Sequence, residues 1–281
     1  MNYIEVLNKS QNELRKYHVK NPFLDSEILL SKALKINRED LIINLNKKIS
    51  KKERKLFFKY INRRKKKEPI AYIVGRKEFW KNKFVVNKNV LIPRPDTEIL
   101  VNETLKYVPI NSSFRILDVG TGSGCVLLSV LKERKKCFGI GTDISKEAIH
   151  IAKFNAKIQH LENRCKFYQA NIDNLYSSKY DLITSNPPYI EKNEIRYLEE
   201  DVKCFEPKLA LDGGYDGISV IKLLIKKSSV LLKKNGKMLI EIENKLLFKI
   251  KKVLKENNFY LDKIIKDFAN RNRCIVCTKL K

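Results

Sequence analysis

The sequence lacks several features that would each define a class of protein. It has no apolar run long enough to cross a bilayer, so we expect no membrane-spanning segment. Its N-terminal residues are mixed and charged, without the basic tip and apolar stretch of a secretory signal, which predicts a cytoplasmic protein. It also has no internal repeats or low-complexity segments. A globular protein remains, and a length of 281 residues favours one large and one small domain.

Cysteine is sparse, and its spacing excludes most cysteine chemistry. The six cysteines are mostly isolated within apolar segments, as expected of buried, reduced thiols. Cys274 and Cys277 form a C-x-x-C, but they lie in an alternating, strand-like run where positions three apart point to opposite faces. Because no second pair completes a zinc site, we expect no metal.

Acidic residues are outnumbered, which gives the chain a net charge of +26. Such a charge is typical of proteins with acidic partners, including nucleic acids, but lysines scattered through every segment favour a compositional bias. Residues 47–67 stand out, with twelve basic residues and one acid, Glu53, around apolar positions. They predict a helix with one apolar and one basic face. That basic face is either a docking surface for an acidic partner or a solvated surface.

The N-terminal residues have the pattern of a helical domain, which we predict over residues 1–70. Leu14 and Tyr17 share one helical stripe, and Asp25 is placed to cap the next helix. Short apolar pieces separated by polar turns follow, and we interpret residues 71–92 as a β-hairpin linker. Beyond Leu14, the expected helices are 26–34, 39–45 and 50–65, and the strand-like pieces are 71–75, 79–80, 84–86 and 90–92.

Residues 93–281 alternate between strand and helix patterns and predict an α/β domain. Such alternation specifies a mostly parallel sheet with helices on both faces. Two closing strands without an intervening helix predict an antiparallel pair at the sheet edge. The expected helices are 97–107, 125–134, 146–158, 218–232 and 245–256, and the expected strands are 114–120, 137–144, 165–172, 180–185, 237–243, 259–267 and 274–279.

Three successive strands end in residues suited to an adenosine ligand. The first runs into Asp118–Gly124, whose glycines allow a tight turn and let helix N–H groups face a ligand. The second ends at Asp143, which suits either the hydroxyls of a ribose or the cap of the following helix. The third ends at Asn171 and Ile172, a polar and an apolar side chain that can flank an adenine ring. Together they favour adenosine binding over chance turns.

The fourth strand is followed by Asn186-Pro187-Pro188-Tyr189. The two prolines make this segment rigid and remove two N–H donors. The Asn186 side-chain oxygen and the Pro187 carbonyl are then free to accept hydrogen bonds from one –NH2 group. Tyr189 offers a flat face to a planar amide or base. A methyl donor with a sulfonium leaving group needs alignment rather than a strong base, so these residues predict methyl transfer to nitrogen.

Asp118–Gly124 with Asn186–Tyr189 resembles the class I methyltransferases that modify amide or exocyclic amino nitrogens. Three further segments narrow this likeness to one family, and they are Val90–Glu98, Glu206–Gly217 and Lys266–Arg273. Over essentially the whole chain, the sequence resembles the bacterial peptide chain release factor glutamine methyltransferases (PrmC, formerly HemK).

The resemblance implies a Rossmann-like class I methyltransferase sheet that uses S-adenosylmethionine and yields S-adenosylhomocysteine. It implies N5-methylation of the glutamine in the Gly-Gly-Gln motif of class I release factors, which the N-terminal domain and hairpin would grip. Nucleic acid is not required, although the basic charge permits weak binding. The expected catalytic residues are Asn186, Pro187, Pro188 and Tyr189. The expected donor-binding residues are Asp118, Gly120, Thr121, Gly122, Ser123, Gly124, Asp143, Ile144, Asn171, Ile172 and Asn186.

The sequence departs from this family at two places. Members often carry an acid at the position of Asn171 and an aromatic residue at that of Ile172, so aliphatic packing would replace ring stacking on the adenine. The tail at 269–273 reads Ala-Asn-Arg-Asn-Arg where a Gly-Arg-Asp-Arg type of sequence is usual.

Three alternatives compete with this interpretation. A nucleic-acid methyltransferase acting on adenine N6 or guanine N2 can use the same tetrapeptide, and the net charge favours it slightly. However, the sequence has no large inserted recognition domain, and an extruded base needs a stacking platform beyond Tyr189. The intact tetrapeptide argues against a non-catalytic RNA-binding protein. No nicotinamide site supports an oxidoreductase.

Overall fold

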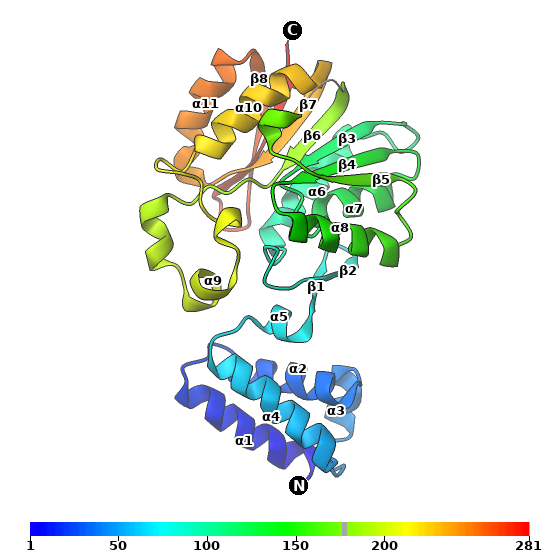
Figure 1. The fold of residues 1–281 in the computed structure, drawn as a ribbon, viewed down its shortest axis with the longest axis vertical. Coiled ribbons are helices and arrows are strands. Elements are labelled where there is room, and N and C mark those ends of the chain that lie inside the picture. The colour runs from blue at the N-terminus through cyan, green and yellow to red at the C-terminus, as the bar shows by residue number, and fades with distance from the viewer. Residues whose placement is uncertain (176–178, 281) are drawn as a thin grey trace. The chain divides into compact units, whose positions relative to one another are not determined.

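The computed structural model describes residues 1–175 and 179–280. The chain forms two compact units (Figure 1). The first, here called the helical unit, comprises residues 1–76 and 199–205. The second, here called the sheet unit, comprises residues 77–198 and 206–281.

Five helices of the helical unit pack around one apolar core that includes Leu14, Leu29, Phe57 and Ile73. Capping boxes start α1 and α4, in which Asn2 pairs with Glu5 and Ser50 with Glu53. Each box satisfies two backbone N–H groups that a helix start leaves unpaired. The helices of this unit are α1 (Tyr3–Lys16), α2 (Pro22–Leu34), α3 (Arg38–Ile43), α4 (Lys51–Lys65), α5 (Ile70–Val74) and α9 (Glu200–Phe205).

The predicted capping role of Asp25 is wrong. α2 begins at Pro22, whose fixed φ suits the first helical position, so Asp25 lies inside the helix. The buried Asp25 carboxylate accepts a hydrogen bond from Arg64 Nε at 2.6 Å. Arg64 also donates to Asp201 at 2.7 Å, so one buried guanidinium joins α2, α4 and α9.

Two predicted strands are also wrong. Residues 71–75 lie in α5 and its C-cap, which follow Pro69 and end at Gly75 with a φ of 83°. A short apolar run does not distinguish a buried helical turn from a strand, and here the buried Ala71, Tyr72 and Ile73 form the turn. Residues 90–92 form a buried loop before Pro93, which has no N–H to donate to a ladder. The hairpin consists of β1 (Arg76–Phe79) and β2 (Asn82–Val85).

The sheet unit contains a seven-stranded sheet of order β5-β4-β3-β6-β7-β9-β8. β5, β4, β3, β6 and β7 are parallel, and β9 and β8 are antiparallel, which confirms the predicted fold class. The strands are β3 (Arg115–Val119), β4 (Phe138–Asp143), β5 (Cys165–Gln169), β6 (Tyr180–Ser185), β7 (Leu232–Glu241), β8 (Phe259–Lys266) and β9 (Asn272–Lys279).

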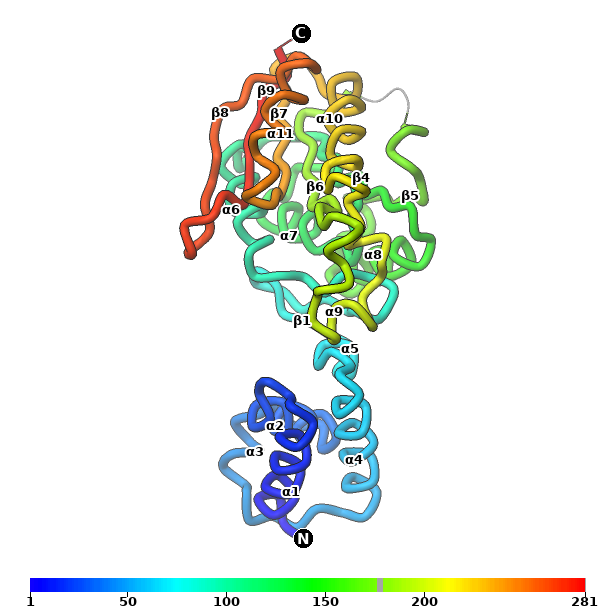
Figure 2. The backbone as a smooth tube through the Cα atoms, turned by 90° about the vertical axis from the view of Figure 1, so that its left-hand side faces the viewer, coloured from blue at the N-terminus to red at the C-terminus, as the bar shows by residue number. Residues whose placement is uncertain are grey.

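Helices cover both faces of this sheet (Figures 1 and 2). α6, α7 and α8 contribute to one apolar core, and α10 and α11 to the other. Cys274 belongs to the first core and Cys277 to the second, which confirms that they point to opposite faces. Five cysteines are buried and only Cys204 of α9 is exposed. The helices are α6 (Glu98–Tyr107), α7 (Cys125–Glu133), α8 (Lys146–Ile158), α10 (Ser219–Leu231) and α11 (Leu247–Glu256).

The strand order places a crevice at the middle of the sheet. From β3 the chain moves outward through β4 and β5, then returns to β6 on the other side of β3. Ligands of open α/β sheets bind at such a reversal, outside the carboxyl ends of the strands. Short 3-10 turns border this edge at Pro95–Thr97, Ile172–Asn174 and Lys208–Ala210, and others lie at Lys192–Tyr197 and Asn244–Leu246. No helix in the described part of the chain is long and apolar enough to cross a membrane.

Candidate active site

A cavity of about 450 Å³ lies at the carboxyl ends of β3, β4, β5 and β6. Its volume is within the range of small-molecule sites. The glycine loop after β3, Asp143 after β4 and Asn186 after β6 all line it. The strand reversal therefore brings together residues that the sequence separates by more than 60 positions.

The glycine loop owes its composition to its backbone. Gly120, Gly122 and Gly124 have φ values of 68°, 54° and 80°, where side chains with a Cβ are strained. A Cβ at Gly120 or Gly122 would meet no atom within 4 Å, so conformation rather than space demands glycine there. Gly124 directly precedes α7, and the loop thus turns toward the start of that helix.

Asp118 forms hydrogen bonds with this loop and with β6. One carboxylate oxygen accepts from Thr121 Oγ1 at 2.6 Å and the other accepts from Thr184 Oγ1 at 2.7 Å. Burial raises the pKa of Asp118 to about 6, against the effect of these two hydrogen bonds. Asp118 lines the cavity, but both of its oxygens already join the loop to β6.

Asp143 accepts hydrogen bonds from the backbone of this loop and from the start of α8. Its Oδ2 accepts from the Gly122 N–H and its Oδ1 from the Ser145 N–H, both at 2.9 Å. Burial raises the pKa of this carboxyl, and the backbone N–H groups oppose that rise. The cap of α8 is Ser145, whose hydroxyl accepts from the Ala148 N–H, so the alternative that Asp143 caps this helix is wrong.

Asn171 and Ile172 line the cavity beyond the end of β5, which stops at Gln169 rather than at residue 172. Asn171 is exposed and caps a short 3-10 turn, while Ile172 is buried and packs with the core on the α10 side of the sheet. The two side chains therefore present one polar and one apolar surface. Val220 and Leu223 of α10 add to the apolar part of the lining.

Asn186 has a defined amide orientation. Its Nδ2 donates to Thr97 Oγ1 at 3.1 Å, and this bond leaves Oδ1 available as an acceptor. Asn186, Pro188 and Thr97 all line the cavity. Pro187 is buried outside the lining, so its side chain shapes the segment rather than the cavity surface.

Tyr189 lies behind the cavity lining. Its hydroxyl donates to Glu241 Oε1 at 3.5 Å. Glu241 is 2% exposed, and burial raises the pKa of its carboxyl to about 7. Burial likewise raises the pKa of Tyr189, so its phenol stays protonated at neutral pH.

The segment Glu206–Gly217 holds the tetrapeptide in place. Ile190 N–H donates to the Leu211 carbonyl at 3.1 Å, and Gly213 N–H donates to the Ile190 carbonyl at 2.8 Å. A Cβ on Gly213 would lie 2.8 Å from Tyr189 Cα, so the two backbones touch. At the other end of the segment, Glu206 accepts from Arg94 at 2.7 Å and fixes the loop before Thr97.

The structure places most of the expected residues on this cavity. Outside the lining are Gly124, Pro187 and Tyr189. Sequence reasoning missed two contributors, the Thr97 hydroxyl beside Asn186 and the carboxyl of Glu241 behind Tyr189. Thr97 follows Asp96 at a helix start, and Glu241 follows an apolar strand, so neither showed a pattern of its own. In residues 1–175 and 179–280, no group of three His, Cys, Asp or Glu side chains is arranged to hold a metal ion.

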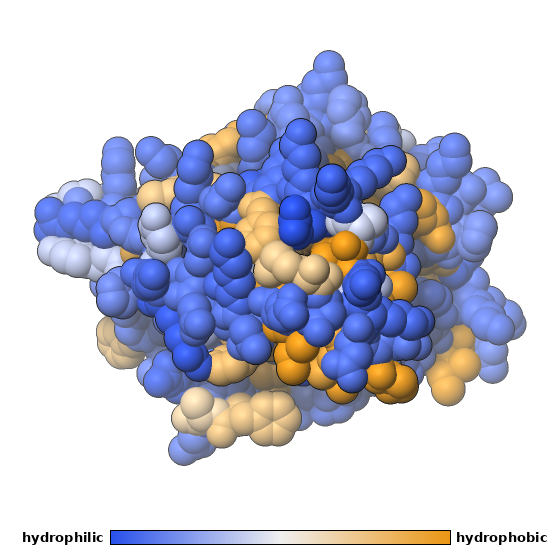
Figure 3. Space-filling view, turned by 90° about the horizontal axis from the view of Figure 1, so that it is seen from below, coloured by the Kyte–Doolittle hydropathy of each residue, from blue (hydrophilic) through white to orange (hydrophobic). Residues whose placement is uncertain are grey.

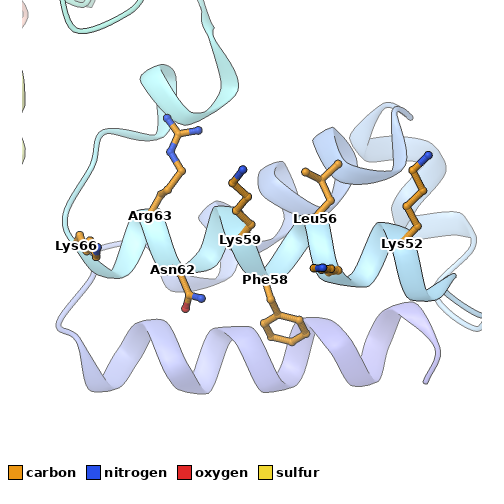
Figure 4. Close-up of a pocket in the computed structure, with 8 residues that line it drawn as sticks. Lys52, Leu56, Phe58, Lys59, Asn62, Arg63 and Lys66 are labelled. Atoms are coloured by element: carbon orange, nitrogen blue, oxygen red, sulfur yellow. The ribbon is translucent and has the colours of Figure 1, made fainter.

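The basic face of α4 forms a separate surface on the helical unit. Lys52, Lys55, Lys59, Asn62 and Lys66 follow one another at helical spacing along a hollow of about 780 Å³ (Figure 4). Lys52, Lys55 and Lys59 are exposed, and none forms an ion pair with a described residue. Hydrophilic residues also dominate the molecular face in Figure 3, with apolar patches between them. Lys65, by contrast, pairs with Glu13 at 3.0 Å.

Two family models match the chain. The PrmC N-terminal domain matches residues 5–75, and a methyltransferase domain matches residues 110–278. The chain is 40% identical to the release factor glutamine methyltransferase of Clostridium acetobutylicum, covering 91% of this chain and 90% of that protein. It is 34% identical to the release factor glutamine methyltransferase of Caulobacter vibrioides, covering 96% and 94%.

Solved structures resemble the sheet unit. A methyltransferase from Pyrococcus furiosus has a TM-score of 0.54 at 19% identity, covering 70% of this chain and 89% of that one. The ribosomal protein L11 methylase from Lactobacillus delbrueckii subsp. bulgaricus has a TM-score of 0.51 at 20% identity, covering 73% and 89%. At these identities the likeness concerns the fold alone, and the fold is that of class I methyltransferases.

Proposed function

Because the chain belongs to the release factor glutamine methyltransferase family, we propose that its cavity holds S-adenosylmethionine and that Asn186–Tyr189 presents the acceptor glutamine. The enzyme methylates the side-chain amide of a release factor glutamine. The finer proposal is that the acceptor is N5 of the glutamine in the Gly-Gly-Gln motif of class I factors. The family predicted from the sequence is confirmed by these relatives.

The residues of the cavity fit the donor. The volume of about 450 Å³ suits a molecule of its size. The N–H groups at the start of α7 suit its carboxylate, and the second lone pairs of the Asp143 oxygens suit the hydroxyls of a ribose. Ser123 lines the cavity, and its buried Oγ has no hydrogen-bond partner in the described parts of the chain. Ile172 and Asn171 would flank the adenine.

The free Asn186 Oδ1 is the observation that carries the proposed chemistry. When bound, S-adenosylmethionine supplies a methyl group on a sulfonium, which is a good leaving group. Asn186 Oδ1 and the Pro187 carbonyl accept hydrogen bonds from the glutamine –NH2 and fix its nitrogen in line with that methyl group. The transfer forms an N–C bond, breaks an S–C bond and releases one proton from the nitrogen. Alignment by these acceptors replaces a strong base.

For the domains we propose residues 1–70 for substrate recognition, 71–92 for the hairpin linker and 93–281 for methyl transfer. The unpaired lysines of α4 support a role in docking. An exposed row of like charges attracts a surface of opposite charge and speeds association at low ionic strength. The occupant that we propose is an acidic surface of the release factor.

The test of the function is transfer of a labelled methyl group from S-adenosylmethionine to a purified class I release factor. We expect label on the intact factor and none when the Gly-Gly-Gln glutamine is replaced by alanine. RNA and DNA serve as parallel acceptors. Label on nucleic acid alone would contradict the proposed acceptor and support the alternative of base amino-methylation.

A further inference from the structure

Glu241 lies beside the tetrapeptide because of the strand register. Ser185, the last residue of β6, pairs with Ile240 of β7, so Asn186 and Glu241 follow at the same level of the sheet. The Glu241 side chain is 2% exposed and does not line the cavity. One of its oxygens accepts from Tyr189, whereas Oε2 has no hydrogen-bond partner among the described residues. A buried carboxyl with a free oxygen is costly and therefore calls for an explanation.

Among the described residues, no cation forms an ion pair with this carboxyl. Arg273 of β9 lies near, but it already pairs with Asp96 at 3.3 Å, Asp267 at 3.1 Å and Glu243 at 3.8 Å. The groups that face Glu241 come from several elements, and they are Asp96 and Thr97 before α6, Tyr189 after β6, Arg273 and Cys274 of β9, and Cys125 of α7. Burial raises the pKa of Glu241 most, and the Thr97 hydroxyl opposes that rise more than the charge of Arg273 or the Tyr189 hydroxyl does.

Thr97 connects Glu241 with Asn186. Its hydroxyl has one proton to donate and lone pairs with which to accept. Since Thr97 Oγ1 accepts from Asn186 Nδ2, its own proton is free to stabilise the Glu241 carboxylate. The Thr97 hydroxyl is near enough to Glu241 to lower the pKa of its carboxyl, and an ionised carboxylate, which only accepts, draws the Thr97 proton toward itself. The Thr97 lone pairs then face Asn186 and select the amide orientation that turns Oδ1 away from them.

We infer that Glu241 is a positioning residue for methyl transfer, whose ionised carboxylate orients the Asn186 amide through Thr97 and anchors Tyr189 through its hydroxyl. The inference rests on the proposed role of Asn186 and goes beyond it. A protonated Glu241 can donate to Thr97, which removes the preference for one orientation of the Asn186 amide. Because the pKa of Glu241 is about 7, this change falls in the neutral range. Activity is therefore lost as the pH falls through that value.

The test compares the wild type with Glu241→Gln, which keeps the volume of the side chain and removes its charge. We expect kcat to fall at least about tenfold, because small misplacements of the reacting groups are costly. The donor Kd should stay within about twofold, because Glu241 does not line the cavity. The acidic limb of the wild-type kcat profile should be absent from the variant. Unchanged kcat with an unchanged pH profile would overturn the inference.

Variants at Thr97 separate positioning from support of the fold. Thr97→Val removes the hydroxyl and should lower kcat to a similar extent, whereas Thr97→Ser keeps it and should restore most of the rate. The double variant of Glu241→Gln with Thr97→Val should be no slower than the worse single variant, because both break one chain of hydrogen bonds. Multiplicative losses would show that the two residues act independently and would overturn the inference.

A second readout needs no acceptor substrate. Selective 15N-asparagine labelling, with Asn186→Asp to assign the signal, follows the side-chain –NH2 of Asn186 by NMR. We expect this signal to titrate with a midpoint near 7 in the wild type and not in Glu241→Gln; a signal insensitive to pH in both proteins would overturn the inference. If the wild type labels no release factor, the proposed function fails, and this titration still decides the role of Glu241.

Discussion

Asn186 and Asp143 both line the cavity, but their hydrogen bonds differ in kind. Asn186 bonds to the Thr97 side chain and keeps its oxygen free, whereas Asp143 uses both oxygens on backbone N–H groups of the loop and of α8. The first arrangement leaves an acceptor for a substrate. The second fixes the wall that a donor would contact. Substitutions at the two positions should therefore separate transfer from donor binding.

Asn186→Ala should lower kcat/KM about 100-fold or more, because it removes a hydrogen bond made to the reacting group. The donor Kd should change by less than about threefold. Labelled-methyl transfer and calorimetry measure the two quantities. Equal losses of donor affinity and transfer would contradict the assigned role of Asn186.

Asp143→Ala should weaken donor binding about 10- to 100-fold, which corresponds to the loss of a hydrogen bond to a charged group together with the support of Gly122. Calorimetric titration with S-adenosylhomocysteine checks this value. Asp143→Asn keeps one acceptor and should fall between the alanine variant and the wild type. An unchanged Kd in the alanine variant would remove the ribose assignment.

Glu241 should also make stability depend on pH. Burial raises its pKa from 4.5 to about 7 in the folded state. The folded state therefore binds this proton more tightly than the unfolded state does. Its contribution to the free energy of unfolding is therefore fully present below pH 4.5 and is lost as the pH rises through 7, by about 3 kcal/mol. Glu241→Gln lacks this loss, so it should gain stability over the wild type between pH 5 and pH 8. Urea unfolding at both pH values measures the gain, and parallel curves would contradict it.

At the scale of elements, the segment Glu206–Gly217 holds the tetrapeptide in position by backbone contacts. The backbone bonds at Ile190 hold one end, and Glu206 with Arg94 holds the loop at the other. The segment carries no expected catalytic residue, yet its glycines are explained by contact with Tyr189 and Ser219. The position of the tetrapeptide therefore depends on the segment Glu206–Gly217.

Gly213→Ala should lower kcat at least about tenfold, since a Cβ there would lie 2.8 Å from Tyr189 Cα and displace it. The rate of methyl transfer, measured beside the melting temperature, checks this effect. Gly75→Ala is the matched control, because its positive φ brings strain without a close neighbour. It should cost stability and leave kcat unchanged. If both variants lose activity equally, contact with Tyr189 is not the cause.

At the scale of the whole molecule, the net charge is +26. A release factor could be attracted by this charge as a whole or by the lysine row of α4 in particular. Replacing Lys52, Lys55 and Lys59 with alanine should slow association with the release factor several-fold at low salt, with the difference shrinking as salt rises. Stopped-flow binding measures the rates. Alanine at Lys251, Lys252 and Lys255 of α11 removes the same charge elsewhere. Equal effects of the two triple variants would contradict a docking site on α4.

The sequence predicted the sheet because strand and helix periods alternate clearly after Thr97, and local spacing is enough to specify that pattern. It predicted lining residues of the cavity in the glycine loop and at Asn186 and Pro188, whereas Pro187 and Tyr189 lie outside the lining. It failed at residues 71–75, where a short apolar run suits helix or strand equally. The sequence did not predict that Glu241 lies beside the tetrapeptide. That position results from the pairing of Ser185 with Ile240, which joins two strands that are distant in sequence.

The distribution of cysteines makes the chain easy to observe. Five thiols are buried, and burial raises the pKa of Cys125, Cys165, Cys274 and Cys277, so these thiols resist alkylation in the folded protein. Cys204 is exposed on α9, the helix of the helical unit that Arg64 of α4 bonds through Asp201. A maleimide dye should therefore attach to the native protein at this one position without any engineered cysteine.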